Sequence, residues 1–253
     1  MRIATWNVNS VRARIERLES WLVATAPDVL LLQETKVADA GFPAPRLAGL
    51  GYESTHYGHG QWNGVAILSR VGLRDVERGL SDGEARLISA TCGPVRCTSC
   101  YVPNGRALDD PHYEAKLRWL EELRARRGAH NAAVPEVIGG DFNVAPSDLD
   151  CYDPTAFVGA THVSAPEREA IRALEATGLT DAWRHLHPDA PGYSWWDYRA
   201  GAFHLDHGLR IDLLLVEDDL VPRLRQVTVD RDARRGPRPS DHAPVWIDIQ
   251  LEG

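Results

Sequence analysis

The chain alternates between short apolar runs and segments in which apolar residues recur every three or four positions. Apolar runs bounded by turn residues indicate strands, and they occur at 2–8, 29–32, 64–69, 87–91, 95–102, 134–138, 211–216 and 245–251. Helical spacing predicts one helix capped by Ser10 and a second opened by Asp110. A third helix is expected to begin near Ser164, where Glu167 completes a capping box, and to stop at Gly178.

Strand–helix–strand units occur in both halves of the chain, and no linker or low-complexity segment divides them. This order predicts the α/β class and a single domain over residues 1–253. The natural packing for such units is a pair of sheets covered by helices. A duplicated sandwich is compatible with the pattern, although the sequence has no clear repeat at a fixed period.

Polar residues stand repeatedly at the ends of the predicted strands. Asn7, Glu34, Tyr101, and Asp141 with Asn143 end or follow strands, Asp212 lies inside the apolar stretch Leu209 to Val216, and the pair Asp241 and His242 precedes the last strand. Binding sites in α/β sheets form at strand ends, so these side chains are expected to converge.

Converging carboxylates require a partner of opposite charge. Two carboxylates 4 Å apart repel by about 1 kcal/mol in water and by about 4 kcal/mol near a protein surface. The candidate ligands carry oxygen, apart from His242, and no thiolate stands among them. This donor set suits Mg²⁺ or Mn²⁺ better than Zn²⁺, and Mg²⁺ commonly binds phosphate substrates.

Each residue also has a purely structural interpretation. Glu34 is compatible with a surface position, and Asn7, Asn104 and Asn143 with caps or turns. Asp212 is harder to explain in this way, because an unpaired carboxylate between Ile211 and Leu213 would be costly to bury. It needs a partner, and we expect His242 to be that partner.

The formal net charge of the 253-residue chain is -8, which is unusual for a nucleic-acid-binding protein. Charge is unevenly distributed, however, because four arginines at 231, 234, 235 and 238 precede Asp241. They suggest a loop that faces phosphate. The N-terminus has no signal-peptide pattern, and no apolar run is long enough to span a bilayer.

The four cysteines are Cys92, Cys97, Cys100 and Cys151. The first three have a spacing that also occurs in plant-type ferredoxins. Cys97 and Cys100 should point to opposite faces of one strand, so we expect buried thiols and not a cluster. Reduced thiols in a chain without an export signal suggest the cytoplasm.

The motifs together resemble the exonuclease III family of apurinic/apyrimidinic endonucleases, within the superfamily that includes deoxyribonuclease I. The matching strings span nearly the whole chain in the family order. They are Trp6-Asn7-Val8-Asn9, Leu32-Gln33-Glu34-Thr35-Lys36, Tyr101-Val102-Pro103-Asn104-Gly105, Gly139-Gly140-Asp141-Phe142-Asn143, Leu209-Arg210-Ile211-Asp212, and Ser240-Asp241-His242-Ala243-Pro244. The resemblance implies a four-layer α/β sandwich of two packed mixed sheets flanked by helices.

The resemblance also implies a DNA-repair phosphodiesterase that requires Mg²⁺ or Mn²⁺. Its substrate would be double-stranded DNA, cut 5′ of abasic sites or trimmed of nucleotides and blocking groups at 3′ ends. A monomer that acts at the nucleoid in the cytoplasm, away from membranes, is the corresponding expectation. The cation ligands implied are Glu34 as the main one, with Asn7, Asp141, Asn143, Asp241 and His242.

The resemblance assigns the following roles. Asp141 would orient or deprotonate the attacking water, Asn143 would help to position it, and His242, oriented by Asp212, would donate to a phosphate oxygen. Tyr101 would lie against the scissile phosphate. Substrate contacts are implied for Asn104, Trp195, Leu209, Arg210 and Ile211, among which Trp195, Leu209 and Ile211 would wall a pocket for a sugar without its base.

Ser10, Val11 and Asn104 depart from residues common in relatives, which bears on the balance between exonuclease and abasic-site activity. Two other functions compete with this one. The first is a superfamily phosphodiesterase or phosphatase for a non-DNA substrate. The segment Trp195-Trp196-Asp197-Tyr198 and the string Tyr101-Val102-Pro103-Asn104-Gly105 argue against it, because both resemble the DNA-repair branch of the superfamily. The second is a non-catalytic nucleic-acid-binding regulator. Such a protein would be expected to have lost ligands such as Glu34 and Asp141, and both are present in this sequence.

Overall fold

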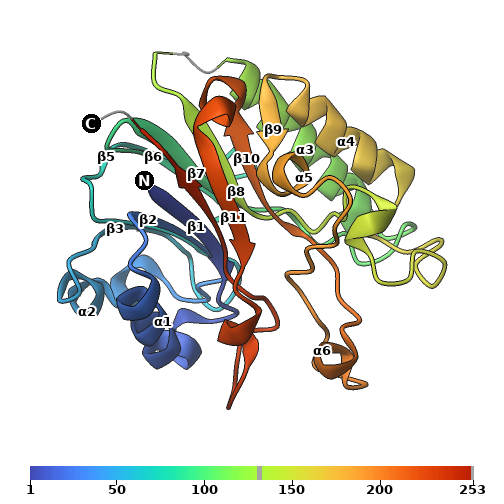
Figure 1. Ribbon diagram of the computed structural model, residues 1–253, viewed down its shortest axis with the longest axis horizontal. Helices are drawn as coiled ribbons and strands as arrows, with labels where there is room; N and C mark the ends of the chain where they lie inside the picture. Colours follow the sequence, from blue (N-terminus) through green and yellow to red (C-terminus); the bar gives the residue numbers. More distant parts are fainter. Residues whose placement is uncertain (130–132, 252–253) are drawn as a thin grey trace.

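The computed structural model describes residues 1–129 and 133–251, whose strands form two six-stranded sheets (Figure 1). The first sheet has the order β11-β12-β1-β2-β4-β3. Its strands are β1 (Arg2–Asn7), β2 (Val29–Gln33), β3 (Glu53–Tyr57), β4 (Val65–Ser69), β11 (Leu224–Val229) and β12 (Val245–Ile249). The second sheet has the order β5-β6-β7-β8-β10-β9. Its strands are β5 (Arg74–Arg78), β6 (Leu87–Cys92), β7 (Val95–Tyr101), β8 (Glu136–Asp141), β9 (Leu179–Asp181) and β10 (Asp212–Glu217).

Helices cover the outer faces of both sheets, with α1 and α2 on the first and α3 and α4 on the second (Figure 1). The α-helices are α1 (Val11–Thr25), α2 (Ala44–Ala48), α3 (Pro111–Gly128), α4 (Ala165–Glu175), α5 (Ala182–Leu186) and α6 (Ala202–Leu205). Short 3₁₀ turns are η1 (Asp39–Gly41), η2 (Asp148–Asp150), η3 (Asp218–Arg223) and η4 (Arg231–Arg234). None of the helices in the described ranges is long and apolar enough to cross a membrane.

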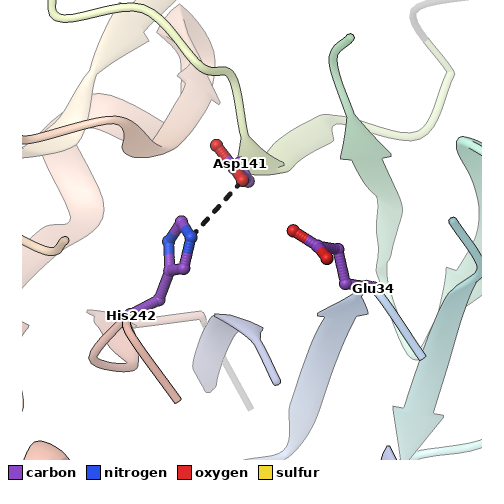
Figure 2. Close-up of side chains that lie close together, drawn as sticks. All are labelled: Glu34, Asp141 and His242. Carbon is purple, nitrogen blue, oxygen red and sulfur yellow. Dashed lines mark ion pairs between the residues drawn. The ribbon is translucent and has the colours of Figure 1, made fainter. Parts of the chain in front are cut away.

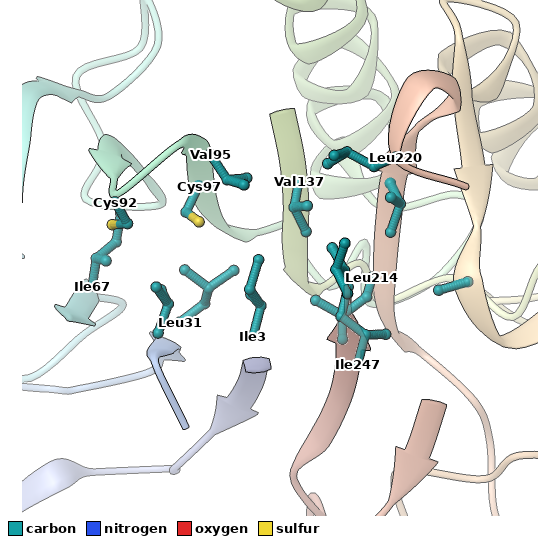
Figure 3. Packing of buried hydrophobic residues seen from close by; sticks show 14 of the residues in the cluster. Ile3, Leu31, Ile67, Cys92, Val95, Cys97, Val137, Leu214, Leu220 and Ile247 are labelled. Atoms are coloured by element: carbon teal, nitrogen blue, oxygen red, sulfur yellow. The ribbon is translucent and has the colours of Figure 1, made fainter. Parts of the chain in front are cut away.

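Three apolar cores separate the four layers. Ile3, Leu31, Val137 and Leu214 meet between the sheets (Figure 3), while two further clusters lie under the helices on each side. Central strands are therefore buried on both faces, which explains why they have continuous apolar runs in the sequence. The predicted α/β sandwich is confirmed.

The helix starts follow the sequence signals. Ser10 and Asp110 cap α1 and α3 with their side chains, and Ser164 and Glu167 form the predicted capping box of α4. The four cysteines are all buried and free, with Cys97 in the core between the sheets and Cys100 on the opposite face. The expectation of buried thiols is confirmed. One domain over residues 1–253 stays a prediction, with 130–132 and 252–253 outside the described residues.

Strand pairing brings the polar strand ends to one edge of the sandwich. β1 and β2 run parallel and pair Asn7 with Gln33, and β7 and β8 run parallel and pair Tyr101 with Asp141. β10 runs antiparallel to β8, which places its first residue, Asp212, opposite Asp141. β12 runs antiparallel to β1, so the residues before β12 lie near the end of β1.

Candidate active site

Glu34, Asp141 and His242 meet where the two sheets end. One ligand atom from each lies within 4.8 Å of the others. Figure 2 shows the three side chains pointing toward one another, although Glu34 follows β2, Asp141 ends β8 and His242 precedes β12. Residues separated by some two hundred positions in the sequence are thus brought together, as their places at strand ends predicted.

Asn7 links the two carboxylates of this group. Its side-chain nitrogen donates to Oε1 of Glu34 at 2.8 Å and to Oδ2 of Asp141 at 2.9 Å. Its side-chain oxygen accepts from the backbone N–H of Asn9 at 3.0 Å. Lys36 stands on the other side, with Nζ 2.6 Å from Oε2 of Glu34. Both oxygens of Glu34 are therefore held in place.

His242 lies between two aspartates and is almost fully buried. Its Nδ1 is 2.8 Å from Oδ2 of Asp212, and its Nε2 is 3.6 Å from Oδ2 of Asp141. Burial alone would lower the pKa of His242, but Asp212 and Asp141 outweigh it and raise this pKa to about 10. His242 is the partner that the sequence required for Asp212, and Ser194 also donates to Asp212 at 2.6 Å.

Asp141 is a buried carboxylate among other carboxylates. Burial raises its pKa to about 7; His242 opposes this rise, while Asp212 and Glu34 add to it. Ionisation of Asp141 beside the carboxylates of Glu34 and Asp212 is therefore unfavourable unless positive charge nearby offsets it. Oδ1 of Asp212 is also buried and accepts no hydrogen bond from the described residues.

Asn143 lies two residues beyond Asp141 in a left-handed conformation, with φ of 52°. Its backbone N–H donates to Oδ1 of Asp141 at 2.9 Å, and its side-chain nitrogen donates to the backbone oxygen of Val102 at 2.9 Å. Its side-chain oxygen accepts from Asn104 at 3.2 Å. Asn143 and Asn104 thus form a fixed pair of amides beside Asp141.

Tyr101 completes this side of the site. Burial, and then the negative charges of Glu34 and Asp141, raise its pKa well above the ordinary value for tyrosine. The guanidinium of Arg86 lies 4.7 Å from the centre of its ring. Tyr101 therefore presents a neutral phenol next to Glu34 and Asp141.

The donor set fits a hard divalent cation. The atoms that approach one another are carboxylate oxygens and one imidazole nitrogen, and oxygen ligands are those that Mg²⁺ and Mn²⁺ prefer. A cation here would oppose the combined effect of burial, Asp212 and Glu34 on Asp141 and would favour its ionised form. Asp241 lies at the margin, where it accepts from Asn9 at 3.0 Å and from Trp195 at 3.1 Å.

Comparison with known proteins agrees with this geometry. The sequence profile described as the endonuclease/exonuclease/phosphatase family matches residues 4–242. The chain belongs to this family. It is 33% identical over 267 aligned residues to exodeoxyribonuclease III of Haemophilus influenzae, with 99% of this chain and 100% of that protein covered.

Two solved structures are also similar over nearly their whole length. The 3′-5′ exonuclease NExo from Neisseria meningitidis is 40% identical, with a TM-score of 0.96 and coverage of 99% and 100%. An AP endonuclease from Archaeoglobus fulgidus is 33% identical, with the same TM-score and coverage. The predicted resemblance to exonuclease III and the abasic-site endonucleases is thus confirmed, and the chain is a DNA-repair hydrolase of this type.

The three residues expected to wall a pocket lie together in this nuclease. Leu209 and Ile211 are buried in a small cluster against which Trp195 packs. Trp195 also pairs with Leu209 and His242 through isolated bridges, and its indole N–H donates to Asp241. The cluster therefore adjoins the carboxylate group directly.

The structure does not support a substrate contact by Arg210, which is 2% exposed. Its guanidinium is held by Asp150, with Nε 2.6 Å from Oδ1, and by Asp181, with Nη2 2.7 Å from Oδ2. Both sides of the guanidinium face protein carboxylates. Arg210 therefore stabilises the position of β10, the strand that begins with Asp212, and does not face the substrate.

The arginine-rich loop also differs from expectation. Arg234 is buried and donates to the backbone oxygen of Trp196 at 2.8 Å, and Arg231 donates to that of Phe203 at 2.6 Å. These two arginines fasten the loop to the segment that carries α6. Only Arg235 and Arg238, of the four, remain exposed for a role toward phosphate.

Sequence reasoning missed a buried lysine behind the asparagine pair. Lys116 is fully buried in α3 and forms an ion pair with Glu167. Its Nζ donates to the backbone oxygens of Asn143 at 2.7 Å and Asn104 at 3.3 Å. The only available signal was a lysine on the same helical face as Tyr113 and Leu120, which is easily taken for a surface residue.

Proposed function

We propose that this protein is a divalent-cation-dependent hydrolase of phosphate esters in double-stranded DNA. It cleaves 5′ of abasic sites, removes nucleotides and blocking groups from 3′ ends, or does both. The observation that supports this most strongly is the convergence of Glu34, Asp141 and His242 at one end of the two sheets. The full-length similarity to a 3′-5′ exonuclease and an AP endonuclease supports DNA as the substrate.

Asp141 acts on the attacking water in this proposal, and Asn143 helps to position that water. Without a cation, burial raises the pKa of Asp141 to about 7, and a cation bound beside it would lower this pKa and keep the carboxylate ionised and able to accept a proton. The backbone N–H of Asn143 fixes the second oxygen of that carboxylate. A general base works best when its pKa lies near the working pH, because much of it is then ionised and it still binds a proton well.

His242 acts as the charged donor to a phosphate oxygen. Its raised pKa keeps the imidazole protonated at neutral pH. An imidazolium has no lone pair for a metal ion, so His242 fits this role better than that of a cation ligand. Asp212 orients the ring through Nδ1, and Tyr101 and Asn104 contact the same phosphate or its neighbour.

The cation is Mg²⁺ or Mn²⁺, and Glu34 is its main ligand, with Asp141, Asp241, Asn7 and Asn143 as supporting residues. A bound cation would neutralise the non-bridging phosphate oxygens and stabilise the leaving 3′ oxygen. Asn7 already directs its amide toward both Glu34 and Asp141, so it keeps the two carboxylates together.

Trp195, Leu209 and Ile211 supply the apolar wall that accepts the sugar at the cleavage position. A sugar without a base, or one at a frayed 3′ end, flips at low cost because its pairing is already lost. The working unit is a monomer acting on DNA at the nucleoid. Arg210 takes part only by holding the strand that carries Asp212.

The test uses three labelled duplexes, which contain an abasic site, a 3′-phosphate at a nick, or intact blunt ends. The wild-type protein is expected to cut the first or dephosphorylate the second with Mg²⁺, and to do neither with EDTA. Asp141→Asn should lower turnover by about three orders of magnitude, or about 4 kcal/mol, while DNA binding persists. Asp189→Asn, at an exposed position, serves as the matched control.

Two results would contradict the proposal. Intact DNA in all three assays, together with hydrolysis of a non-DNA phosphodiester, would favour another substrate of the superfamily. Tight DNA binding without any cleavage at saturating Mg²⁺ or Mn²⁺ would favour a non-catalytic regulator.

A further inference from the structure

The loop that carries Glu34 has an unusual backbone. Glu34 and Lys36 have φ values of 50° and 52°, a left-handed conformation that residues other than glycine seldom adopt. Residues in this conformation are strained and persist only where the surroundings hold them. Here the backbone N–H groups of Thr35 and Lys36 donate to the facing loop, at Gly64 and Asn63, over 3.1 and 2.9 Å.

Thr35, between these two residues, anchors the loop from the inside. Its side chain is fully buried, and Oγ1 lies 2.8 Å from Nε2 of His56 in β3. Nδ1 of His56 lies 2.7 Å from Oδ1 of Asp39. A chain of hydrogen bonds, here named the Asp39–His56–Thr35 chain, therefore runs from the surface to the residue next to Glu34.

The direction of these hydrogen bonds follows from the protonation state of His56. Burial lowers the pKa of His56, and Asp39 opposes this effect without cancelling it. The neutral ring carries its proton on Nδ1, where it donates to the carboxylate of Asp39. Nε2 then has a free lone pair, so the hydroxyl of Thr35 is the donor of the hydrogen bond between them.

Close packing fixes the position of the imidazole. The ring stacks on Phe42 with centroids 4.3 Å apart. A Cβ atom at Gly58 would lie 2.4 Å from Cε1 of His56, and one at Gly64 would lie 2.1 Å from Oγ1 of Thr35. The Asp39–His56–Thr35 chain therefore requires glycine at both positions, because a side chain at either one would displace His56 or Thr35.

We propose that His56 is a positioning residue for cation binding, which acts through the hydroxyl of Thr35 to hold the Glu34 carboxylate toward Asp141. This inference rests on the proposed function, in which Glu34 is the main cation ligand. Asp39 and His56 have no catalytic role in it. Their contribution is to keep a strained loop in one conformation before the cation arrives.

The experiment measures Mn²⁺ binding to the protein without DNA, by electron paramagnetic resonance of the free ion. Thr35→Val removes the hydroxyl at nearly constant volume, and His56→Phe removes both ring hydrogen bonds while keeping the stack on Phe42. Each should weaken Mn²⁺ binding by about tenfold, which is typical for loss of a residue that orients a ligand. Thr35→Ser, which restores the hydroxyl, should bind within about twofold of wild type.

A double variant separates positioning from stability. Thr35→Val alone leaves Nε2 of His56 without its donor, which destabilises the fold. Combining Thr35→Val with His56→Phe removes both partners, so the urea midpoint should recover while Mn²⁺ binding stays about tenfold weaker. Thr55→Val is the matched control. It alters another buried threonine, in β3 next to His56, and should not change Mn²⁺ binding.

The outcomes distinguish this inference from the proposed function. If Thr35→Val and the double variant bind Mn²⁺ like wild type while Glu34→Gln loses binding, the positioning role is wrong and the proposed function stands. If Glu34→Gln also binds like wild type, the assignment of the main ligand fails and the inference fails with it.

Discussion

Nδ1 of His242 lies 2.8 Å from Oδ2 of Asp212, although thirty residues separate them in the sequence. Asp212 begins β10 and pairs across the sheet with Asp141, the residue that Nε2 of the same imidazole faces at 3.6 Å. The ring is thus held between two carboxylates, those of Asp212 and Asp141. The protonation state of His242 depends on this placement.

Asp212→Asn should lower the pKa of His242, because it removes the nearest negative charge that stabilises the imidazolium. In the wild type the imidazolium persists until the pH approaches about 10. The variant should therefore lose activity on the alkaline side at a lower pH. A pH profile of the single-turnover rate would show the shift, together with a rate lower by about 100-fold at pH 7.

Ser194→Ala serves as a control, because it removes a neutral hydrogen bond to Asp212 and leaves the charge. Its alkaline limb should stay close to that of the wild type. If Asp212→Asn left the alkaline limb unmoved, Asp212 would not be the residue that keeps His242 protonated.

Lys116→Met should destabilise the protein by about 3 kcal/mol, because Glu167 would remain as a buried, unpaired carboxylate. The rate constant should also fall by about tenfold, since Asn143 and Asn104 lose the cation that holds their backbone oxygens. Urea unfolding and single-turnover cleavage measure the two effects separately.

The double variant Lys116→Met with Glu167→Gln tests this separation. It removes both charges, so part of the stability should return. The rate constant should not return, because the ammonium that holds the asparagine pair is still absent. Recovery of both quantities together would mean that Lys116 contributes only to stability.

Arg210→Met should lower stability by about 3 kcal/mol, because Asp150 and Asp181 would lose the cation buried between them. The affinity for an abasic duplex should stay within about twofold, since the guanidinium does not reach the surface. Thermal unfolding and gel-shift titration check the two expectations, with the exposed Arg172→Met as the control. Weaker DNA binding by Arg210→Met at unchanged stability would instead support a direct contact between Arg210 and DNA.

The sequence predicted the strands that lie inside the sheets, and the strands that it missed are edge strands. β3, β5, β9 and β11 stand at the four edges of the two sheets. β5 is mostly exposed and β9 has three residues, so neither requires an apolar run. Central strands are buried on both faces, which leaves a composition that can be recognised without coordinates.

The site was predictable as far as strand ends determine it. Glu34, Asp141 and His242 follow or precede apolar runs, and the need of Asp212 for a partner could be argued from burial cost alone. Lys116 and His56 could not be found in this way. Their function depends on packing between α3 and α4 and between β3 and the loop after β2, which sequence spacing does not determine.

The carboxyl of Glu175, at the end of α4, makes stability depend on pH. Burial raises its pKa to about 7; Asp181 adds to the rise, and Arg210 and Arg172 oppose it. The folded protein therefore holds this proton more tightly than the unfolded chain. This contribution is complete below about pH 4.5 and is lost as the pH rises to about 7.

Glu175→Gln should remove this pH dependence, because the amide resembles the protonated acid. The variant should match the wild type near pH 4.5 and exceed its stability above pH 7 by about 1–2 kcal/mol, after allowance for solvent screening. Urea unfolding at several pH values measures the difference. Glu169→Gln, at an exposed position of the same helix, should show no such trend, and a constant difference across pH for Glu175→Gln would contradict the assignment.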